Sequence, residues 1–118
     1  MEFENVVQKR RSIRKFYPDC VEKEKIEKLL ECARLCQSSK NRQPWKFMIL
    51  EDHVKNEIAD IMLELVQQSN VELPGYMNSS KSSAKIIKNA PLLILVFKDK
   101  DDDWQVGDML SIGAAIEH

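Results

Sequence analysis

PWKFMILE (residues 44–51) and LLILVF (residues 92–97) are the segments of this chain whose composition favours a β-strand. The first is aromatic and β-branched in character and begins with a proline. The second is a continuous apolar run bounded by Pro91 and by the charged residues 98–103. Such a run is typical of a strand that is covered on both faces. We therefore expect two strands, separated by about forty residues of other structure.

Helical patterns surround these two strands. Residues 22–37 carry one apolar stripe, with glutamates and lysines on the opposite face. Asp52 and Asp103 are candidate N-caps for two later helices. The expected helices are residues 3–9, residues 22–37, one after Asp52, a short one ending near Lys88, and one from Trp104 onward. Residues 69–83, rich in Ser, Asn, Pro and Gly, resemble a linker, with a loop around residues 73–75.

The length of 118 residues corresponds to one domain, so we expect a single domain over residues 1–118. Two strands do not form a satisfactory sheet by themselves. We therefore expect either a fragment of a larger fold or a chain that borrows strands from a partner. The last helix has small residues in its middle (residues 113–115), which favours close packing against another helix.

The overall composition excludes several classes of protein. Apolar residues make up 43% and charged residues 31% of the chain, which is the balance of an ordinary globular protein. The net charge of -1 argues against nucleic-acid binding by bulk charge. No apolar run is long enough to span a bilayer, and the first ten residues lack the design of a secretory signal. We therefore expect a cytoplasmic protein with no membrane or nucleic-acid partner.

Glycine and cysteine spacing restrict the binding chemistry further. The three glycines, Gly75, Gly107 and Gly113, do not form the GxGxxG or GxxxxGK motifs, so side chains and helix ends must hold any phosphate. Three cysteines are too few for a disulfide framework. Cys32 and Cys36 lie four residues apart on one helix, but no other Cys or His completes a zinc spacing. We expect buried structural thiols there and no metal site.

KRRSIRK (residues 9–15) places five cations and a hydroxyl within seven residues, directly after a short helix. The planar guanidinium group of arginine suits phosphate oxygens, and Ser12 adds a further donor. This pattern predicts a compact anion site that needs no glycine. The alternative is a solvated basic turn, which is the commoner state of a charge run.

QSSKNRQPW (residues 37–45) forms a second polar cluster, between a helix and a strand. Its Ser, Asn and Gln side chains offer hydroxyl and amide groups for the rim of a heteroaromatic ligand. The alternative is a plain polar loop in which Trp45 anchors the chain to the core.

Together these clusters resemble the FMN-dependent nitroreductase family. The resemblance rests, in order, on RRSIRKF (10–16), VEKEKIEKLLECARLCQSSKNRQPWKFMIL (21–50), NAPLLILVF (89–97) and D-x-x-x-x-GAAIEH (108–118). It implies an α+β fold, with a central sheet flanked by helices, in an intertwined homodimer. It also implies that FMN binds at the subunit interface.

The resemblance assigns two sets of cofactor-binding residues. One set holds the FMN phosphate and ribityl chain, and the other lines the isoalloxazine edge bound by the opposite subunit. The phosphate and ribityl set is Arg10, Arg11, Ser12 and Arg14. The isoalloxazine set is Ser38, Ser39 and Asn41. Residues 43–45 are expected to fix the loop rather than touch the flavin. The family usually has proline where this chain has Gln37, so the loop departs from the family pattern there.

In this family the cofactor performs the redox step, with NAD(P)H as donor and a nitroaromatic, quinone or similar small molecule as acceptor. The resemblance therefore implies no catalytic acid, base or nucleophile. Family members generally continue beyond the position of residue 118, so the chain corresponds to the N-terminal two-thirds of the domain. The alternative function is a truncated, non-catalytic fragment that dimerises or binds flavin.

Overall fold

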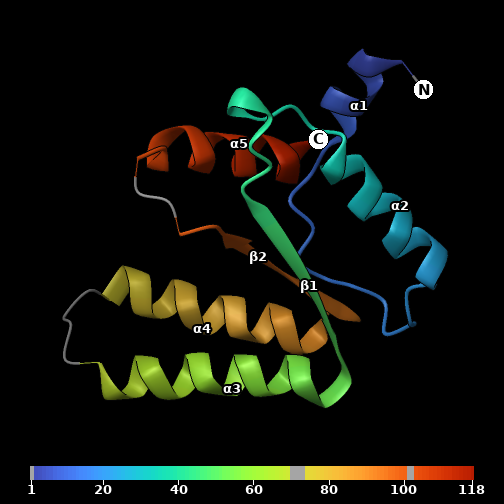
Figure 1. The fold of residues 1–118 in the computed structure, drawn as a ribbon. Helices are drawn as coiled ribbons and strands as arrows, with labels where there is room; N and C mark the ends of the chain where they lie inside the picture. Colours follow the sequence, from blue (N-terminus) through green and yellow to red (C-terminus); the bar gives the residue numbers. More distant parts are fainter. Residues whose placement is uncertain (1, 70–73, 101–102) are drawn as a thin grey trace.

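The computed structural model describes residues 2–69, 74–100 and 103–118. Its elements are α1 (Phe3–Lys9), α2 (Lys23–Arg34), the 3-10 turn η1 (Ser39–Asn41), β1 (Trp45–Glu51), α3 (Asp52–Gln68), α4 (Pro74–Asn89), β2 (Leu92–Lys98) and α5 (Gln105–Glu117) (Figure 1). The predicted order of helices and strands is confirmed across these ranges.

The two strands pair with each other in antiparallel orientation. The register runs from Trp45 opposite Lys98 to Glu51 opposite Leu92. The prediction that the second strand is covered on both faces is wrong, because its residues are half-buried or exposed, and Phe97 is 45% exposed. Helix α3 contacts both strands and α5 contacts β2, but together they cover the small sheet incompletely.

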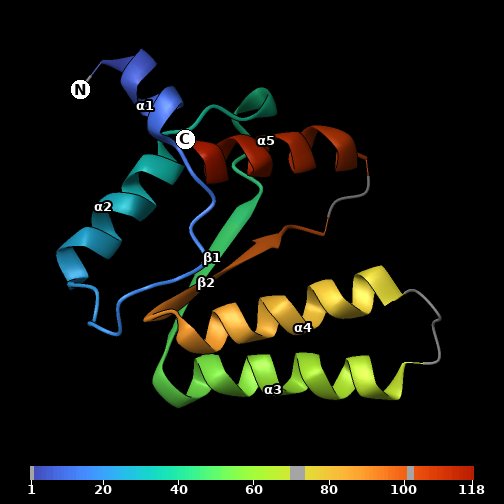
Figure 2. The ribbon, with the colours of Figure 1, turned by 180° about the vertical axis from the view of Figure 1, so that it is seen from behind.

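Helices lie on both sides of this sheet. Helices α3 and α4 run side by side as a hairpin on one side, while α5 and α2 lie on the other (Figure 1 and Figure 2). Among the described residues, the buried apolar side chains are few and mostly small: Pro44, Ala59, Ala84, Ile112 and Ala115. The architecture is therefore α+β, as expected, with a thin core.

Helix α4 corrects the expectation of a linker and a short helix. It begins at Pro74 and continues for 16 residues to Asn89. Proline suits the first position of a helix, because its missing N–H has no intrahelical partner there and its φ is already helical. Leu73, placed in the expected loop, lies outside the described residues.

Both predicted N-caps are wrong. Asp52 is the first residue of α3 and has a φ of 49°, while Glu51 occupies the cap position. Trp104 occupies the cap position of α5, so Asp103 lies one residue before it. Neither cap residue forms a side-chain capping hydrogen bond. Helix α3 follows β1 directly, so the last residue of the strand, Glu51, also occupies the cap position.

The thiols of Cys32, in α2, and of Cys36, just after it, are more accessible than expected. Cys32 is exposed and Cys36 is half-buried, so the prediction of buried structural thiols is wrong. The stripe of α2 that is turned inward includes Leu30 and Ala33. Cys32 precedes Ala33 and is turned away from it by about 100° around the helix axis.

The longest described helix, α3, has 17 residues and carries charged side chains along its length. Within residues 2–69, 74–100 and 103–118, no helix combines the length and the apolar character needed to cross a membrane.

A buried lysine joins the two helices of the hairpin. Lys55 of α3 is 4% exposed, and its Nζ donates to the backbone oxygens of Ile87 (2.8 Å) and Lys88 (3.0 Å) and to Asn56 Oδ1 (2.9 Å). The last carbonyls of a helix lack intrahelical partners and carry the negative end of the helix dipole. The ammonium group of Lys55 therefore caps the C-terminus of α4.

We expect Lys55→Met to lower the free energy of unfolding by about 1–3 kcal/mol, because the carbonyls of Ile87 and Lys88 lose the donor that Lys55 provides. Urea denaturation followed by circular dichroism measures this change. Lys85→Met, at an exposed position on α4, is the matched control and should change stability by less than about 0.5 kcal/mol. Equal effects of the two substitutions would contradict the capping role.

Candidate functional site

Residues 37–43, called here the polar loop, connect α2 to the start of β1 and adopt an unusual backbone. Lys40, Asn41 and Gln43 have φ values of 51°, 53° and 48°. The left-handed region is disfavoured for residues with a Cβ, although asparagine tolerates it best. Gln43 N donates to Ser38 Oγ (3.0 Å), and Gln43 Nε2 donates to Asn41 Oδ1 (3.2 Å). Local polar contacts thus stabilise a tight turn without glycine.

Helix α5 provides the surface on which the polar loop lies. Ser39 N donates to Ser111 Oγ (3.1 Å), and Ser111 Oγ donates to Gly107 O (2.8 Å). A Cβ added to Gly107 would lie 3.5 Å from Ser39 Oγ, so the loop and the helix are in direct contact there. Figure 1 and Figure 2 both show η1 beside α5.

A buried ion pair fastens the end of the polar loop to the same helix. Arg42 Nε donates to Asp108 Oδ1 (2.9 Å), and Arg42 Nη2 donates to Asp108 Oδ2 (3.2 Å). The side chain of Asp108 is fully buried, and that of Arg42 is 24% exposed. Removing one partner of a buried ion pair typically costs about 3–5 kcal/mol, against about 1–3 kcal/mol when a buried neutral group loses its hydrogen-bond partner. The ion pair is therefore the strongest attachment of the polar loop to α5.

Trp104 extends this attachment to the surface. The Lys40 ammonium lies 4.3 Å from the centre of its indole ring, and the Arg42 guanidinium lies 5.5 Å from it. Both distances are within the range of cation–π attraction. Two cations of the polar loop thus lie against the ring of the residue that directly precedes α5.

Sequence reasoning missed Arg42, Trp104 and Asp108 as site residues. One signal was present: Asp108 is the single charged residue in the apolar run VGDMLSIGAAI (106–116). A carboxylate in a buried helix face requires a partner, since burial of an unpaired charge is strongly unfavourable. The identity of that partner, 66 residues away, was not accessible from the pattern.

An open groove of about 380 Å³ lies where the polar loop meets α5. Its lining combines serine hydroxyls with small and apolar side chains: Gln37, Ser38, Ser39, Gly107, Leu110, Ser111 and Ala114. Of the second predicted set, Ser38 and Ser39 line this groove, and Asn41 follows them on the exposed side of η1. The structure therefore brings this set together.

The first predicted set lies in the extended segment after α1. Arg10, Arg11, Ser12 and Arg14 are all exposed. Arg11 Nη1 donates to Gln8 O (2.8 Å) and Arg10 O (2.7 Å), and Arg14 Nη1 contacts Ser12 O (3.4 Å). In the part of the chain that the structure describes, no ion pair joins these arginines to a carboxylate. Their remaining N–H groups are a donor set suited to phosphate oxygens.

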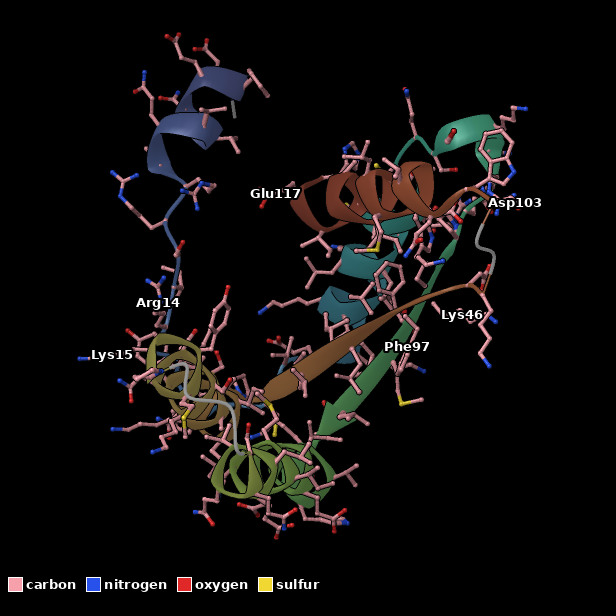
Figure 3. The ribbon with its side chains drawn as sticks, turned by 90° about the vertical axis from the view of Figure 1, so that its left-hand side faces the viewer. Arg14, Lys15, Lys46, Phe97, Asp103 and Glu117 are labelled. Carbon is pink, nitrogen blue, oxygen red and sulfur yellow. The ribbon has the colours of Figure 1, made fainter. Side chains whose placement is uncertain are left out.

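The two sets do not meet within one chain. Figure 3 shows Arg14 and Lys15 on one side of the molecule and Asp103, which leads into α5, on the opposite side. The polar loop contacts α5, so it lies on the Asp103 side. A ligand that touches both sets must therefore bind between two chains, or the chain must change conformation to bring the two sets together.

The chain matches the Nitroreductase family over residues 7–118. It is 30% identical over 97 residues to 5,6-dimethylbenzimidazole synthase of Rhodospirillum rubrum, a match that covers 80% of this chain and 46% of the synthase. The chain thus spans about half the length of that curated relative.

Solved structures of nitroreductases and of a related flavoprotein are similar to this chain in fold. An FMN-dependent nitroreductase from Clostridium difficile R20291 is 28% identical, with a TM-score of 0.71, and the match covers 97% of this chain and 51% of that one. A BluB-like flavoprotein from Clostridium difficile 630 is 27% identical, with a TM-score of 0.69 and coverage of 99% and 67%.

We expect Ser111→Ala to lower the free energy of unfolding by about 1 kcal/mol, because the Ser39 N–H loses its acceptor. Ser82→Ala on α4 is the matched control, since the two changes have the same effect on helix propensity and Ser82 is exposed. Chemical denaturation of both variants measures the difference. A Ser111→Ala protein as stable as the control would contradict the docking of the loop on α5.

Proposed function

The chain belongs to the nitroreductase family, and on that basis we propose that it is an FMN-dependent oxidoreductase that uses NAD(P)H to reduce nitroaromatic, quinone or similar small acceptors. The observation that carries the proposal is that the chain has both an exposed arginine segment (residues 10–14) and a preformed polar loop, on opposite sides. Both have the donor chemistry that FMN requires, namely cations for a phosphate and neutral polar groups for a ring edge.

The arginine segment would hold the phosphate and ribityl chain. Each guanidinium of Arg10, Arg11 and Arg14 presents five N–H donors in a planar fork, and the Ser12 hydroxyl adds another. Arg11 and Arg14 use only part of this capacity on nearby backbone oxygens. The donor set therefore fits a dianionic phosphate, and exposure leaves it accessible.

The polar loop would border the isoalloxazine ring. Ser38, Ser39 and Asn41 offer hydroxyl and amide groups beside an open groove. Groups of this kind hydrogen-bond to ring nitrogens and carbonyls and stabilise negative charge that develops there. When bound, FMN would supply the transfer of hydride and electrons from NAD(P)H to the acceptor. We propose no catalytic acid, base or nucleophile from this chain.

We also propose that two copies of the chain share each site. The arginine segment and the polar loop lie on opposite sides of one chain, so a partner copy would supply the second set. Helix α5 supports this arrangement, because Met109, Leu110 and Ile116 are 56%, 71% and 61% exposed. Apolar side chains grouped on one exposed helix face are typical of an interface.

The chain spans 46% of the synthase and 51% of the nitroreductase described above, so the activity of those whole proteins is a proposal for this chain. The same fact favours a second candidate, a flavin-binding or dimerising module without turnover. Oxidation of NAD(P)H in the presence of FMN and a nitroaromatic or quinone acceptor separates the two, since only the first predicts turnover. The cytoplasmic location and the single domain over residues 1–118 stay predictions.

We expect Arg14→Ala to weaken FMN binding by about 1–3 kcal/mol, roughly fivefold to more than a hundredfold in Kd. Quenching of flavin fluorescence measures the Kd. Riboflavin, which lacks the phosphate, is the matched ligand, and its affinity should be unchanged by the substitution. Lys28→Ala removes an exposed cation from α2 and should leave both affinities unchanged. Equal losses for FMN and riboflavin would contradict a phosphate contact.

A mixing experiment tests whether the site is shared between chains. Arg14→Ala and Asn41→Ala proteins, each weak in FMN binding, are unfolded together and refolded. If the two sets come from different protomers, each mixed dimer contains one intact site, and about a quarter of all sites regain wild-type affinity. A mixture that binds no better than either variant alone would show that both sets act within one chain.

A further inference from the structure

Asp108 has an environment that the proposed FMN contacts do not explain. Its carboxylate is fully buried, and both of its oxygens accept hydrogen bonds from Arg42. A buried carboxylate requires a cationic partner of good geometry, and the two-point contact with a guanidinium provides it. Asp108 therefore fixes both the position and the orientation of the Arg42 side chain.

Arg42 in turn is part of the polar loop. It follows η1 directly, and its backbone N–H donates to Ser39 O (3.1 Å). It stands between Asn41 and Gln43, whose φ values are left-handed. Fixing the Arg42 side chain therefore restrains the backbone on both sides of it.

The other contacts between the polar loop and α5 or Trp104 are weaker types of interaction than the Arg42–Asp108 ion pair. The Ser39–Ser111 contact is one neutral hydrogen bond, and the Lys40–Trp104 contact is a cation–π pair at the surface. Neither contact sets the orientation of the loop as a two-point ion pair does.

We propose that Arg42 and Asp108 are positioning residues, whose ion pair holds Ser38, Ser39 and Asn41 in the conformation that receives the flavin ring. This inference rests on the proposed function for the choice of ligand. The pair itself does not touch the ligand; it acts through the backbone of the polar loop.

Hydrogen exchange of the apo protein tests this inference without flavin. In Asp108→Asn, which preserves shape but removes the charge, the amide protons of Ser39, Arg42 and Gln43 should exchange about tenfold faster or more. Amides in the α3–α4 hairpin, such as that of Ala84, should keep their rates. Unchanged exchange in the loop, or equal acceleration throughout the chain, would overturn the inference.

Glu31→Gln is the matched control variant. Arg34 contacts Glu31 by the same two-point geometry, with both distances 2.7 Å, but both side chains are more than half exposed and belong to α2. This variant should leave loop exchange and flavin affinity unchanged. If it accelerates loop exchange as much as Asp108→Asn does, the effect is not specific to the buried pair and the inference fails.

A second variant keeps the test decisive if Asp108→Asn does not fold. Arg42→Lys retains the charge but loses the two-point contact, so the protein should fold while loop exchange and the Kd for FMN both rise. The double variant Arg42→Met with Asp108→Leu separates positioning from stability, because an apolar pair often replaces a buried ion pair without loss of stability. Restored melting temperature with weak FMN binding supports positioning, whereas restored affinity overturns it.

The outcome for flavin separates the two proposals. Wild-type chain that does not bind FMN, with loop exchange still dependent on Asp108, contradicts the proposed function but leaves the restraint of the polar loop established. Wild-type chain that binds FMN, with variants that bind equally well, contradicts the positioning role and leaves the proposed function intact.

Discussion

The antiparallel pairing of Trp45 with Lys98 brings the start of β1 and the end of β2 to the same end of the sheet. A backbone hydrogen bond from Asp99 N to Pro44 O (2.9 Å) continues the pairing beyond the strands. The polar loop enters β1 and α5 follows β2, so the chain must place these two segments together. The contacts between Ser39 and Ser111, and between Arg42 and Asp108, depend on this register. Parallel pairing would put them at opposite ends of the sheet.

Much of the fold could be predicted from periodicity, because most elements carry a strong local pattern. The apolar runs in β1 and β2 and the stripe in α2 are examples of that pattern. The boundaries were less accessible. Asp52 and Asp103 have the chemistry of N-caps, but the tertiary path of the chain places Glu51 and Trp104 at those positions instead. Local propensity is a weak guide where a tight connection fixes the backbone.

Burial was harder to predict than secondary structure. The continuous apolar run of β2 indicates a strand enclosed on both faces, yet Phe97 is nearly half exposed. Cys32 lies in a helix with a clear stripe but outside the stripe itself. Periodicity identifies which residues share a face, whereas the amount of cover depends on what packs there. The two-stranded sheet here has less cover than its sequence leads one to expect.

The candidate site also has a part that local sequence indicates and a part that only the tertiary structure reveals. Its contact residues form two short clusters whose composition indicates their chemistry, while the pair that anchors the polar loop joins residues far apart in sequence. The polar loop also passes through left-handed conformations at Lys40, Asn41 and Gln43 without using glycine. Left-handed φ values are unfavourable for residues with a Cβ, so the native contacts of the polar loop must offset this backbone strain. The loop therefore stores conformational energy, which would be released if it came free of α5.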